Sequence, residues 1–598
     1  MLILKSSYSI GYAGVNLYSK YFPILEWSKS YTYKDFADDS LAAIIVTIML
    51  IPQSLAYAML AGLPPEMGLY ASIIPLILYA IFGTSKTLAV GPVAVIALMT
   101  SASCSQFANP GSTDYAILAI ILAVMSGMML IIMGLLKLGF IANFLSHPVI
   151  SGFITASGLI IAASQLNHIF GIEGRGSNLF DILLNLAQNF TDLNFHTLVI
   201  GTVALIILFW CKKKLKKFML DKGSSPLVSD IVSRTGPVIA VVLTTLAVWL
   251  FGLGINEVAI VGRIPDGLPS LGIPYFSFSI WVELLAPALL ISLVGYVETV
   301  SVAQTLASKR RQRIDPNQEL IALGFSNLGS GTSGGFPVTG GFARSVVNFD
   351  AGAKTPAAGA FTAIGIAFAT LFLTPFLFYL PKATLAATII VAVLSLVDFK
   401  SVLRIFSYSK SDGVAMLCTI LSTLLMGVEI GIISGVAISL LMYLYRTSRP
   451  HIARVGQVPG TQHFRNVNRH LVITSEKVIS LRIDESLYFP NARFLEDSVY
   501  AYIGREPEIK DMILVFSAIN YLDASALESL EAINRRLADA EVNLHFSEVK
   551  GPVMDQLQRT HLLAELSGQV FLSQYDAFKT LEPELSKKSL TPNKSQAS

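Results

Sequence analysis

Long apolar runs recur along the first three quarters of the chain, and they constrain its fold more than any other feature. A membrane span needs roughly 20 mostly apolar residues, so several runs can cross a bilayer alone while others are short. Only 14% of the 598 residues are charged, against about 25% in soluble globular proteins. The sequence therefore predicts an α-helical polytopic membrane protein. The runs cover residues 41–60, 66–83, 115–136, 197–210, 236–253, 282–306, 357–380, 383–397, 412–427 and 430–445.

Basic residues gather in three short clusters between these runs, Lys212–Lys217, Lys309–Arg313 and Lys400–Lys410. Lysine and arginine are retained on the cytoplasmic side of membrane proteins, so we expect an even number of crossings before each cluster. Beside apolar spans, such clusters indicate orientation rather than nucleic-acid binding. Residues 1–35 lack the order of a cleaved signal peptide and are expected to form a cytoplasmic segment.

The composition changes after Tyr445, where charged residues become frequent and no run is long enough to span. We therefore predict a transmembrane domain over 36–446, a linker over 447–475, a soluble domain over 476–580 and a disordered tail over 581–598. Within the soluble domain the pattern predicts a parallel β/α unit with a right-handed crossover. Its expected elements are a half-buried strand at 477–483, a buried strand at 511–517, a helix at 524–540 and a strand at 542–546.

Two places in the membrane part break the helical pattern in similar ways. "TSKTLAVGPVAVIALM" (84–99) joins an extended piece and a Gly-Pro pair to half a helix, and "GGFPVTGGFARS" (334–345) is followed by another short segment. Interrupted, short apolar segments at corresponding positions of two halves indicate a transporter site formed by half-helices. Irregular backbone at that depth is tolerated only where it faces protein or a water-filled cavity.

The second stretch does not match a nucleotide-phosphate loop. Gly335 and Gly340 have the spacing of a Walker motif, but Gly341 and Phe342 occupy the positions of its lysine and hydroxyl residue. A helix that begins near Ala343 would instead aim free N–H groups and its positive dipole end at an anion. Arg344 would add a full charge there, and Pro92 suits the first turn of the opposing half-helix, where its missing N–H costs nothing.

These residues resemble the SulP (sulfate permease) anion transporters, the bacterial relatives of the SLC26 group. The resemblance rests on "IPQSLAYAMLAGLPPEMGLY" (51–70), "VGPVAV" (90–95), "LVGYVETVSVAQTLA" (293–307) and "GGFPVTGGFARSVVN" (334–348). It implies fourteen membrane segments in a 7+7 inverted repeat, with half-helices as segments 3 and 10. It also implies a core domain that moves against a gate domain, a cytoplasmic STAS domain, and homodimers in the cell membrane.

The resemblance places the substrate site between segments 3 and 10. Many relatives carry serine immediately before the arginine, where this chain has Ala343, so the preferred anion differs if that hydroxyl selects it. The expected substrate-binding residues are Gln53, Tyr57, Gly91, Pro92, Val93, Gly341, Phe342, Ala343, Arg344 and Ser345.

Glu298 is the expected proton-coupling residue. A carboxyl group buried in an apolar helix is hard to ionise and can exchange protons near neutral pH, and some relatives resemble proton symporters with an acid at this place. The alternative is a structural ion pair. In the STAS part, Asp523 and Ser525 match the family's Asp-x-Ser loop. Ala524 replaces the serine that is phosphorylated in soluble proteins of this fold, so we expect Ser525 to cap the following helix.

The leading hypothesis is secondary transport of a small anion, sulfate first, by proton symport or anion exchange. Bicarbonate, with sodium held near Thr299, Ser301, Gln304 and Thr305, and a C4-dicarboxylate are the alternative substrates. An anion channel is the alternative mechanism. The cysteines and histidines show no metal spacing, and no catalytic motif is present, so we expect neither an enzyme nor a metal or other cofactor.

Overall fold

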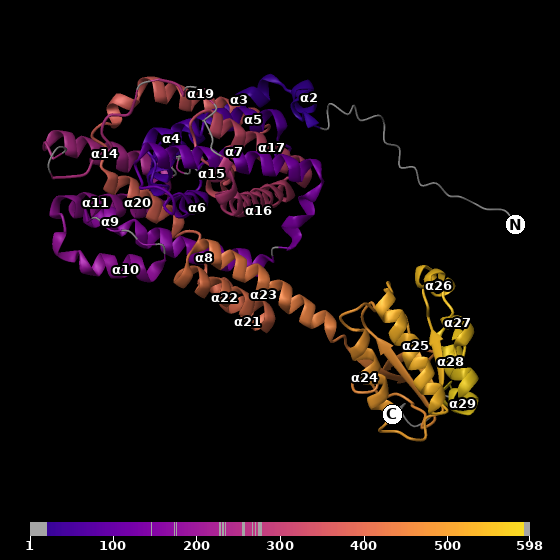
Figure 1. Cartoon of the computed structure of the whole chain (residues 1–598). Coiled ribbons are helices and arrows are strands. Elements are labelled where there is room, and N and C mark those ends of the chain that lie inside the picture. Colours follow the sequence, from indigo (N-terminus) through magenta and orange to yellow (C-terminus); the bar gives the residue numbers. More distant parts are fainter. Residues whose placement is uncertain are drawn as a thin grey trace. The chain divides into compact units, whose positions relative to one another are not determined.

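The computed structural model describes residues 21–590, apart from 145, 173, 175, 177, 226–228, 230, 231, 234, 254–256, 266, 270 and 273–277. Residues 1–20 of the predicted N-terminal segment and residues 591–598 of the predicted tail therefore lie outside the described residues. The chain divides into two compact units between Ser439 and Leu440, a few residues before the boundary that we predicted at 446 (Figure 1).

The first unit is almost entirely helical. Seven described helices are long and apolar enough to cross a membrane, and five shorter helices are also apolar, so the count of fourteen segments stays a prediction. The unit contains α2 Ile24–Trp27, α3 Tyr33–Leu60, α4 Pro65–Tyr70, α5 Ile74–Phe82, β1 Val90–Gly91, α6 Ala94–Cys104, α7 Thr113–Leu135, α8 His147–Ser164, α9 Leu166–Phe170, α10 Leu179–Gln188, α11 Phe195–Trp210, α12 Lys216–Asp221, α14 Gly236–Leu250, α15 Phe278–Glu283, α16 Leu285–Lys309, α17 Pro316–Thr332, β2 Thr339–Gly340, α18 Phe342–Asp350, α19 Ala357–Phe372, α20 Lys382–Val393, α21 Phe399–Tyr408, α22 Lys410–Met426 and α23 Val428–Ser448.

Glycines let α7 and α17 approach each other closely. A Cβ atom added to Gly127 would lie 2.8 Å from the carbonyl oxygen of Gly324, and a Cβ added to Gly324 would lie 2.8 Å from the carbonyl oxygen of Gly127. Small residues at a helix interface allow such backbone approach in membranes, where dispersion contacts drive helix association. This pair forms the middle of the helical bundle that carries the site.

The packing of the helices repeats between the two halves of this unit. Helices α3 and α8 of the first half pack on α19 and α22 of the second half, and helices α16 and α20 of the second half pack on α7 and α11 of the first half. When α3 is matched with α16, α7 with α19, α8 with α20 and α11 with α22, the contact between α3 and α19 corresponds to that between α16 and α7. The contact between α8 and α22 then corresponds to that between α20 and α11. This pattern agrees with the predicted inverted repeat.

The same contacts group the helices into two bundles. The first bundle consists of α3, α5, α6, α7 and α16 to α19, and the second of α8, α9, α11, α14, α20, α22 and α23. Helix α23 belongs to the second bundle because Gly431 and Gly435 lie against Thr423 and Thr419 of α22. The bundles meet where α3 packs on α14 and α20 and where α6 packs on α8.

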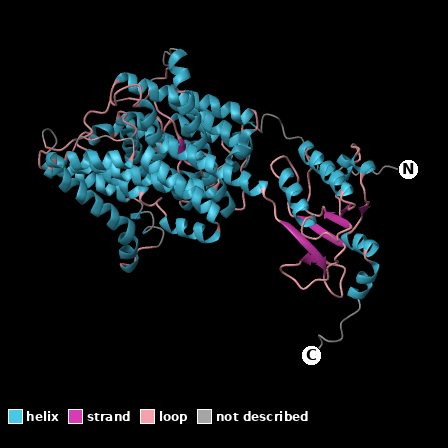
Figure 2. Ribbon diagram, turned by 60° about the horizontal axis from the view of Figure 1, so that its bottom comes forward, coloured by secondary structure: helices cyan, strands magenta, loops and turns pink. Residues whose placement is uncertain are grey.

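The second unit is a six-stranded sheet with the order β4-β3-β5-β6-β7-β8, and Figure 2 shows it in magenta with helices against it. Strands β5 to β8 are parallel, whereas β3 runs antiparallel to both β4 and β5. The strands are β3 Ile452–Gln457, β4 Phe464–Asn466, β5 Val478–Ile483, β6 Asp511–Val515, β7 Asn543–Ser547 and β8 Val570–Phe571. The helices are α24 Ala492–Ile503, α25 Ala524–Asp539, α26 Gly551–Leu557, α27 Leu562–Glu565, α28 Gln574–Leu581 and α29 Pro583–Leu590.

The predicted β/α unit is confirmed in β5, β6, α25 and β7, but three other predictions for this part of the chain are wrong. The predicted linker 447–475 contains β3 and β4, because β3 completes the sheet by pairing with β5. Strand β5 is buried along nearly its whole length rather than half-buried, because Ile479, Leu481 and Ile483 pack in one core cluster and Val478 packs in another. In the predicted tail 581–598, residues 583–590 form α29, which packs on α28.

The predicted cap of α25 is also wrong. The carboxylate of Asp523 accepts hydrogen bonds from the backbone N–H of Ala526 at 2.9 Å and of Phe489 at 2.7 Å. Asp523 is therefore the N-cap, whereas Ser525 lies exposed in the first turn. Aspartate and serine cap helices about equally well, and the extended backbone of Asp523 just before the helix decides between them.

Candidate functional site

Two short strands bring the broken segments together at the centre of the first unit. β1 pairs antiparallel with β2, with Val90 opposite Gly340 and Gly91 opposite Thr339. Helix α6 begins after Val93 and α18 begins after Gly341. Because the strands are antiparallel, the two half-helices leave the centre in opposite directions and their N-termini face each other.

Neither N-terminus is capped by a side chain. The first N–H groups of a helix have no intrahelical partner, and the helix dipole places partial positive charge there. Two such ends directed at one place favour an anion between them. The structure thus contains the two half-helices that the glycine-rich stretches predicted.

Arg344 lies in the first turn of α18 and is only 2% exposed. Its Nη1 donates a hydrogen bond to the carbonyl oxygen of Pro92 at 2.6 Å, which holds the guanidinium against the start of α6. Its Nε and Nη2 are buried and have no hydrogen-bond partner among the described residues. A buried charged donor without a partner is costly, so the guanidinium has two donors available for an anion.

Glycines make room for this guanidinium. A Cβ atom added to Gly341 would lie 2.8 Å from Nη2 of Arg344, and one added to Gly91 would lie 3.4 Å from the same atom. The two positions were predicted to belong to the site, and the structure shows that each backbone borders the arginine.

We expect Gly341→Ala to weaken anion binding while the protein stays folded. The new methyl group must displace the end of the Arg344 side chain, and a misplacement on the order of 1 Å can cost roughly 10- to 100-fold in function. The measurement is the apparent affinity for sulfate in reconstituted vesicles. Gly359→Ala is the matched control, because its Cβ would meet no atom closer than 3.6 Å. Equal affinities for the two variants would contradict this geometry.

Hydroxyl groups fasten β2 to α16. Thr339 Oγ1 donates to the carbonyl oxygen of Gly295 at 2.6 Å and lies 2.8 Å from Thr299 Oγ1, which accepts from the backbone N–H of Gly340 at 2.9 Å. Thr299 is therefore occupied in holding the strand. Sequence reasoning missed Thr339, although a threonine directly before the paired glycines was the available signal.

The four residues considered for sodium do not gather at one point. Thr305 Oγ1 donates to the carbonyl oxygen of Ser301 at 2.7 Å, and Ser301, Gln304 and Thr305 are exposed while Thr299 is buried.

Ser345 supports the site rather than presenting a donor to it. Its hydroxyl donates to the carbonyl oxygen of Gly341 at 2.7 Å and accepts from the backbone N–H of Ala89 at 2.9 Å. Asn348, one turn further along α18, donates from Nδ2 to the carbonyl oxygen of Thr87 at 3.0 Å. These bonds tie α18 to the segment that enters β1, so Ser345 is a positioning residue.

Helix α3 contributes Gln53 and Tyr57, which lie four residues apart on one face. Both are largely buried, at 6% and 9% exposure, and neither side chain has a hydrogen-bond partner among the described residues. Helix α3 packs on both half-helices, and the charge of Arg344 acts on the Tyr57 hydroxyl. Phe342 and Ala343 are exposed at the start of α18.

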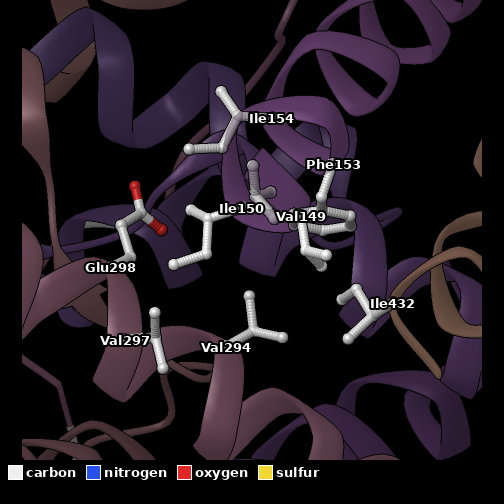
Figure 3. A pocket seen from close by; sticks show the side chains of 9 residues that line it. Val149, Ile150, Phe153, Ile154, Val294, Val297, Glu298 and Ile432 are labelled. Carbon is white, nitrogen blue, oxygen red and sulfur yellow. The ribbon is translucent and has the colours of Figure 1, made fainter. Parts of the chain in front are cut away.

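Glu298 lies beside a pocket whose other lining residues are apolar, and Figure 3 shows its carboxyl group at the edge of that pocket. Within the described residues Glu298 has no ion pair and no hydrogen bond. The alternative, a structural salt bridge, therefore has no basic partner among them. The charges of Glu298 and Arg344 nevertheless act on each other. The pocket is lined by Val95, Val149, Ile150, Phe153, Ile154, Val294, Val297, Glu298 and Ile432.

A second buried carboxylate, Glu319 of α17, was missed. It accepts from Tyr79 Oη at 2.7 Å and from the backbone N–H groups of Thr84 at 2.8 Å and Ser85 at 3.1 Å. Such a fully hydrogen-bonded carboxylate is stabilised without a cation. Its role is to anchor the segment that leads into β1, and its position in the first turn after Asp315 gave no sequence signal for that contact.

Comparisons with known proteins agree with this architecture. The model of the "Sulfate permease family" matches residues 36–419, and that of the "STAS domain" matches residues 471–577. "Sulfate transporter 4.1, chloroplastic" from Arabidopsis thaliana is 35% identical over 564 residues, which are 92% of this chain and 80% of that protein. "High affinity sulfate transporter 2" from Stylosanthes hamata is 32% identical over 586 residues, 94% and 86% of the two chains.

Two solved structures share the fold. The murine Slc26a9 anion transporter in the inward-facing state has a TM-score of 0.86 at 24% identity and covers 97% of both chains. The transmembrane domain of the cyanobacterium bicarbonate transporter BicA has a TM-score of 0.58 at 22% identity and covers 68% of this chain and 98% of that one. The bacterial character that we expected is not borne out, because both sequence relatives are plant proteins. The chain belongs to the sulfate permease family, whose members are transporters rather than enzymes, and it carries a STAS domain after its membrane unit.

Proposed function

We propose that the protein carries sulfate across a membrane by exposing the site around Arg344 to one side at a time. The observation that carries this proposal is the buried guanidinium with two unpartnered nitrogens between two facing helix N-termini. One full positive charge and two partial charges suit a small, doubly charged oxyanion, whose oxygens can accept from several donors at once. The names of the plant relatives support the choice of sulfate.

We propose further that protons drive uptake through Glu298. A carboxylate close to Arg344 competes with a divalent anion for the same positive charge, and protonation removes that competition. Binding of a proton and of sulfate then favour each other, which is the thermodynamic basis of symport. We also assign the protein to the cell membrane as a homodimer, with its N-terminus and STAS domain in the cytoplasm.

The test is uptake of radiolabelled sulfate, bicarbonate, chloride and succinate into vesicles that contain the purified protein, each with and without a pH or sodium gradient. We expect saturable sulfate accumulation that increases when the outside is acidic and is accelerated by unlabelled sulfate inside. Sodium-driven bicarbonate uptake without sulfate uptake would contradict both sulfate as the substrate and the proton as the coupling ion. Fast, non-saturable flux without acceleration from the opposite side would indicate a channel.

A further inference from the structure

A hydrogen bond between side chains joins the C-terminal end of half-helix α6 to the second bundle. Ser103 Oγ, in the last turn of α6, lies 2.9 Å from Oε1 of Glu429 in the first turn of α23. Ser103 is fully buried and Glu429 is partly buried. The helix that carries half of the anion site is thus fastened, at its far end, to a helix of the other bundle.

The basic clusters identify the face on which this contact lies. Helix α16 ends at Lys309 and α22 begins at Lys410, both within the clusters that we assign to the cytoplasmic side. Helix α22 ends at Met426 on the opposite face. Glu429 follows it by three residues, so the contact between Ser103 and Glu429 lies at the outer face of the membrane unit.

On the cytoplasmic side of Glu298, helix α16 carries a polar, exposed face. From Glu298 towards Lys309, α16 exposes Ser301, Gln304 and Thr305, which share one face of the helix. A polar stripe on a membrane helix faces water rather than lipid. On the outer side of Glu298, Val294 and Ile432 instead close the pocket between the two bundles. This arrangement is the one expected of a site that opens to the cytoplasm and is closed from the outside.

We propose that Glu429 is a positioning residue that, through Ser103, latches α6 to α23 and keeps the outer side closed. A carrier must open its site to each side in turn, so α6 and α23 have to separate at this end in the outward-open state. The Ser103 hydroxyl also lies 2.8 Å from the carbonyl oxygen of Met99. While the latch is closed, the Ser103 hydroxyl donates its proton to the carboxylate, which is the stronger acceptor. When the latch opens, the hydroxyl can rotate and donate to the carbonyl oxygen of Met99, so no buried donor is left unpaired.

The inference rests on the proposed carrier function, but its test needs no sulfate. Cys104, Cys211 and Cys418 are the three cysteines of the chain. In the test protein these three cysteines are replaced and one cysteine is introduced by Ile432→Cys. Residue 432 is buried in the pocket, one helical turn from Glu429. Its thiol is labelled from outside with a membrane-impermeant reagent. Failure of sulfate transport would therefore not affect the readout.

We expect Glu429→Ala to increase the labelling rate by roughly ten-fold or more, the factor that corresponds to one hydrogen bond to a charged group. Ser103→Ala should do the same without further increase in the double variant. Glu429→Gln keeps an oxygen that accepts from Ser103 and should restore slow labelling. The matched control is Glu257→Ala, because Glu257 pairs with His196 at 3.6 Å within the second bundle.

Two results would overturn the latch. One is that Glu429→Ala labels no faster than Glu257→Ala, and the other is that Glu429→Gln labels as fast as Glu429→Ala. Size-exclusion chromatography and thermal unfolding of each detergent-solubilised variant serve as the check that it is folded, and neither of these measurements needs sulfate.

Discussion

Arg344→Ala is expected to abolish sulfate binding and yet to leave the empty protein at least as stable as the parent. Each hydrogen bond to a charged group contributes about 1.5–3 kcal/mol, and Nε and Nη2 offer two of them to the anion. Their loss should raise the dissociation constant by roughly 100-fold or more. In the empty site no carboxylate among the described residues is hydrogen-bonded to the buried guanidinium, whose Nε and Nη2 stay unpartnered, and its removal ends that cost.

Thermal unfolding in detergent with increasing sulfate separates these effects. A ligand that binds only the folded state raises its melting temperature according to its concentration and affinity. We expect the parent protein to be stabilised progressively by sulfate and Arg344→Ala to be unaffected. Arg344→Lys is the matched comparison, because an ammonium keeps the charge but cannot donate to the Pro92 carbonyl and span the anion as the planar guanidinium does. A sulfate response in Arg344→Ala equal to that of the parent would refute the assignment of the site.

The sequence allowed the main parts of this site to be predicted because each leaves a local signal. Gly-Pro before half a helix, and glycines before Ala343 and Arg344, are unusual in apolar surroundings, and the structure confirms two facing half-helices there. Glu298 was identified in the same way, since an acid within an apolar helix is rare.

What could not be predicted depends on contacts between residues far apart in the chain. Ser345 was assigned to the substrate, but its hydroxyl is used by Ala89 and Gly341. Glu319 looked ordinary because its partner, Thr84, is known only once the fold brings the two residues together. The position of Thr339 before the paired glycines was a signal, but its contact with Gly295 could not be read from the sequence. The same limit explains β3, whose assignment to a linker ignored the pairing with β5.

Glu298→Gln is expected to bind sulfate but to lose the effect of a pH gradient on its transport. The amide has the shape of the protonated acid and carries no charge, so it does not compete with the anion for Arg344 at any pH. Binding should therefore remain as tight at neutral pH as it is in the parent under acidic conditions, and it should change little between about pH 5 and 8. The parent should bind more weakly as the pH rises, because the ionised carboxyl group repels a divalent anion.

The decisive measurement is sulfate accumulation against a gradient in vesicles that are acidic outside. The parent should concentrate sulfate, whereas Glu298→Gln should exchange labelled for unlabelled sulfate at a comparable rate but only equilibrate it. This difference separates a coupling residue from one that merely shapes the pocket, since a packing defect would slow exchange and accumulation together.

Glu298→Asp keeps an ionisable group at the same point of α16 and should retain part of the accumulation. Accumulation by Glu298→Gln to the level of the parent would mean that the proton binds elsewhere. The proton site would then lie outside this pocket, because no other ionisable side chain lies among the described residues that line it. The apolar lining around residue 298 would serve only to close the pathway.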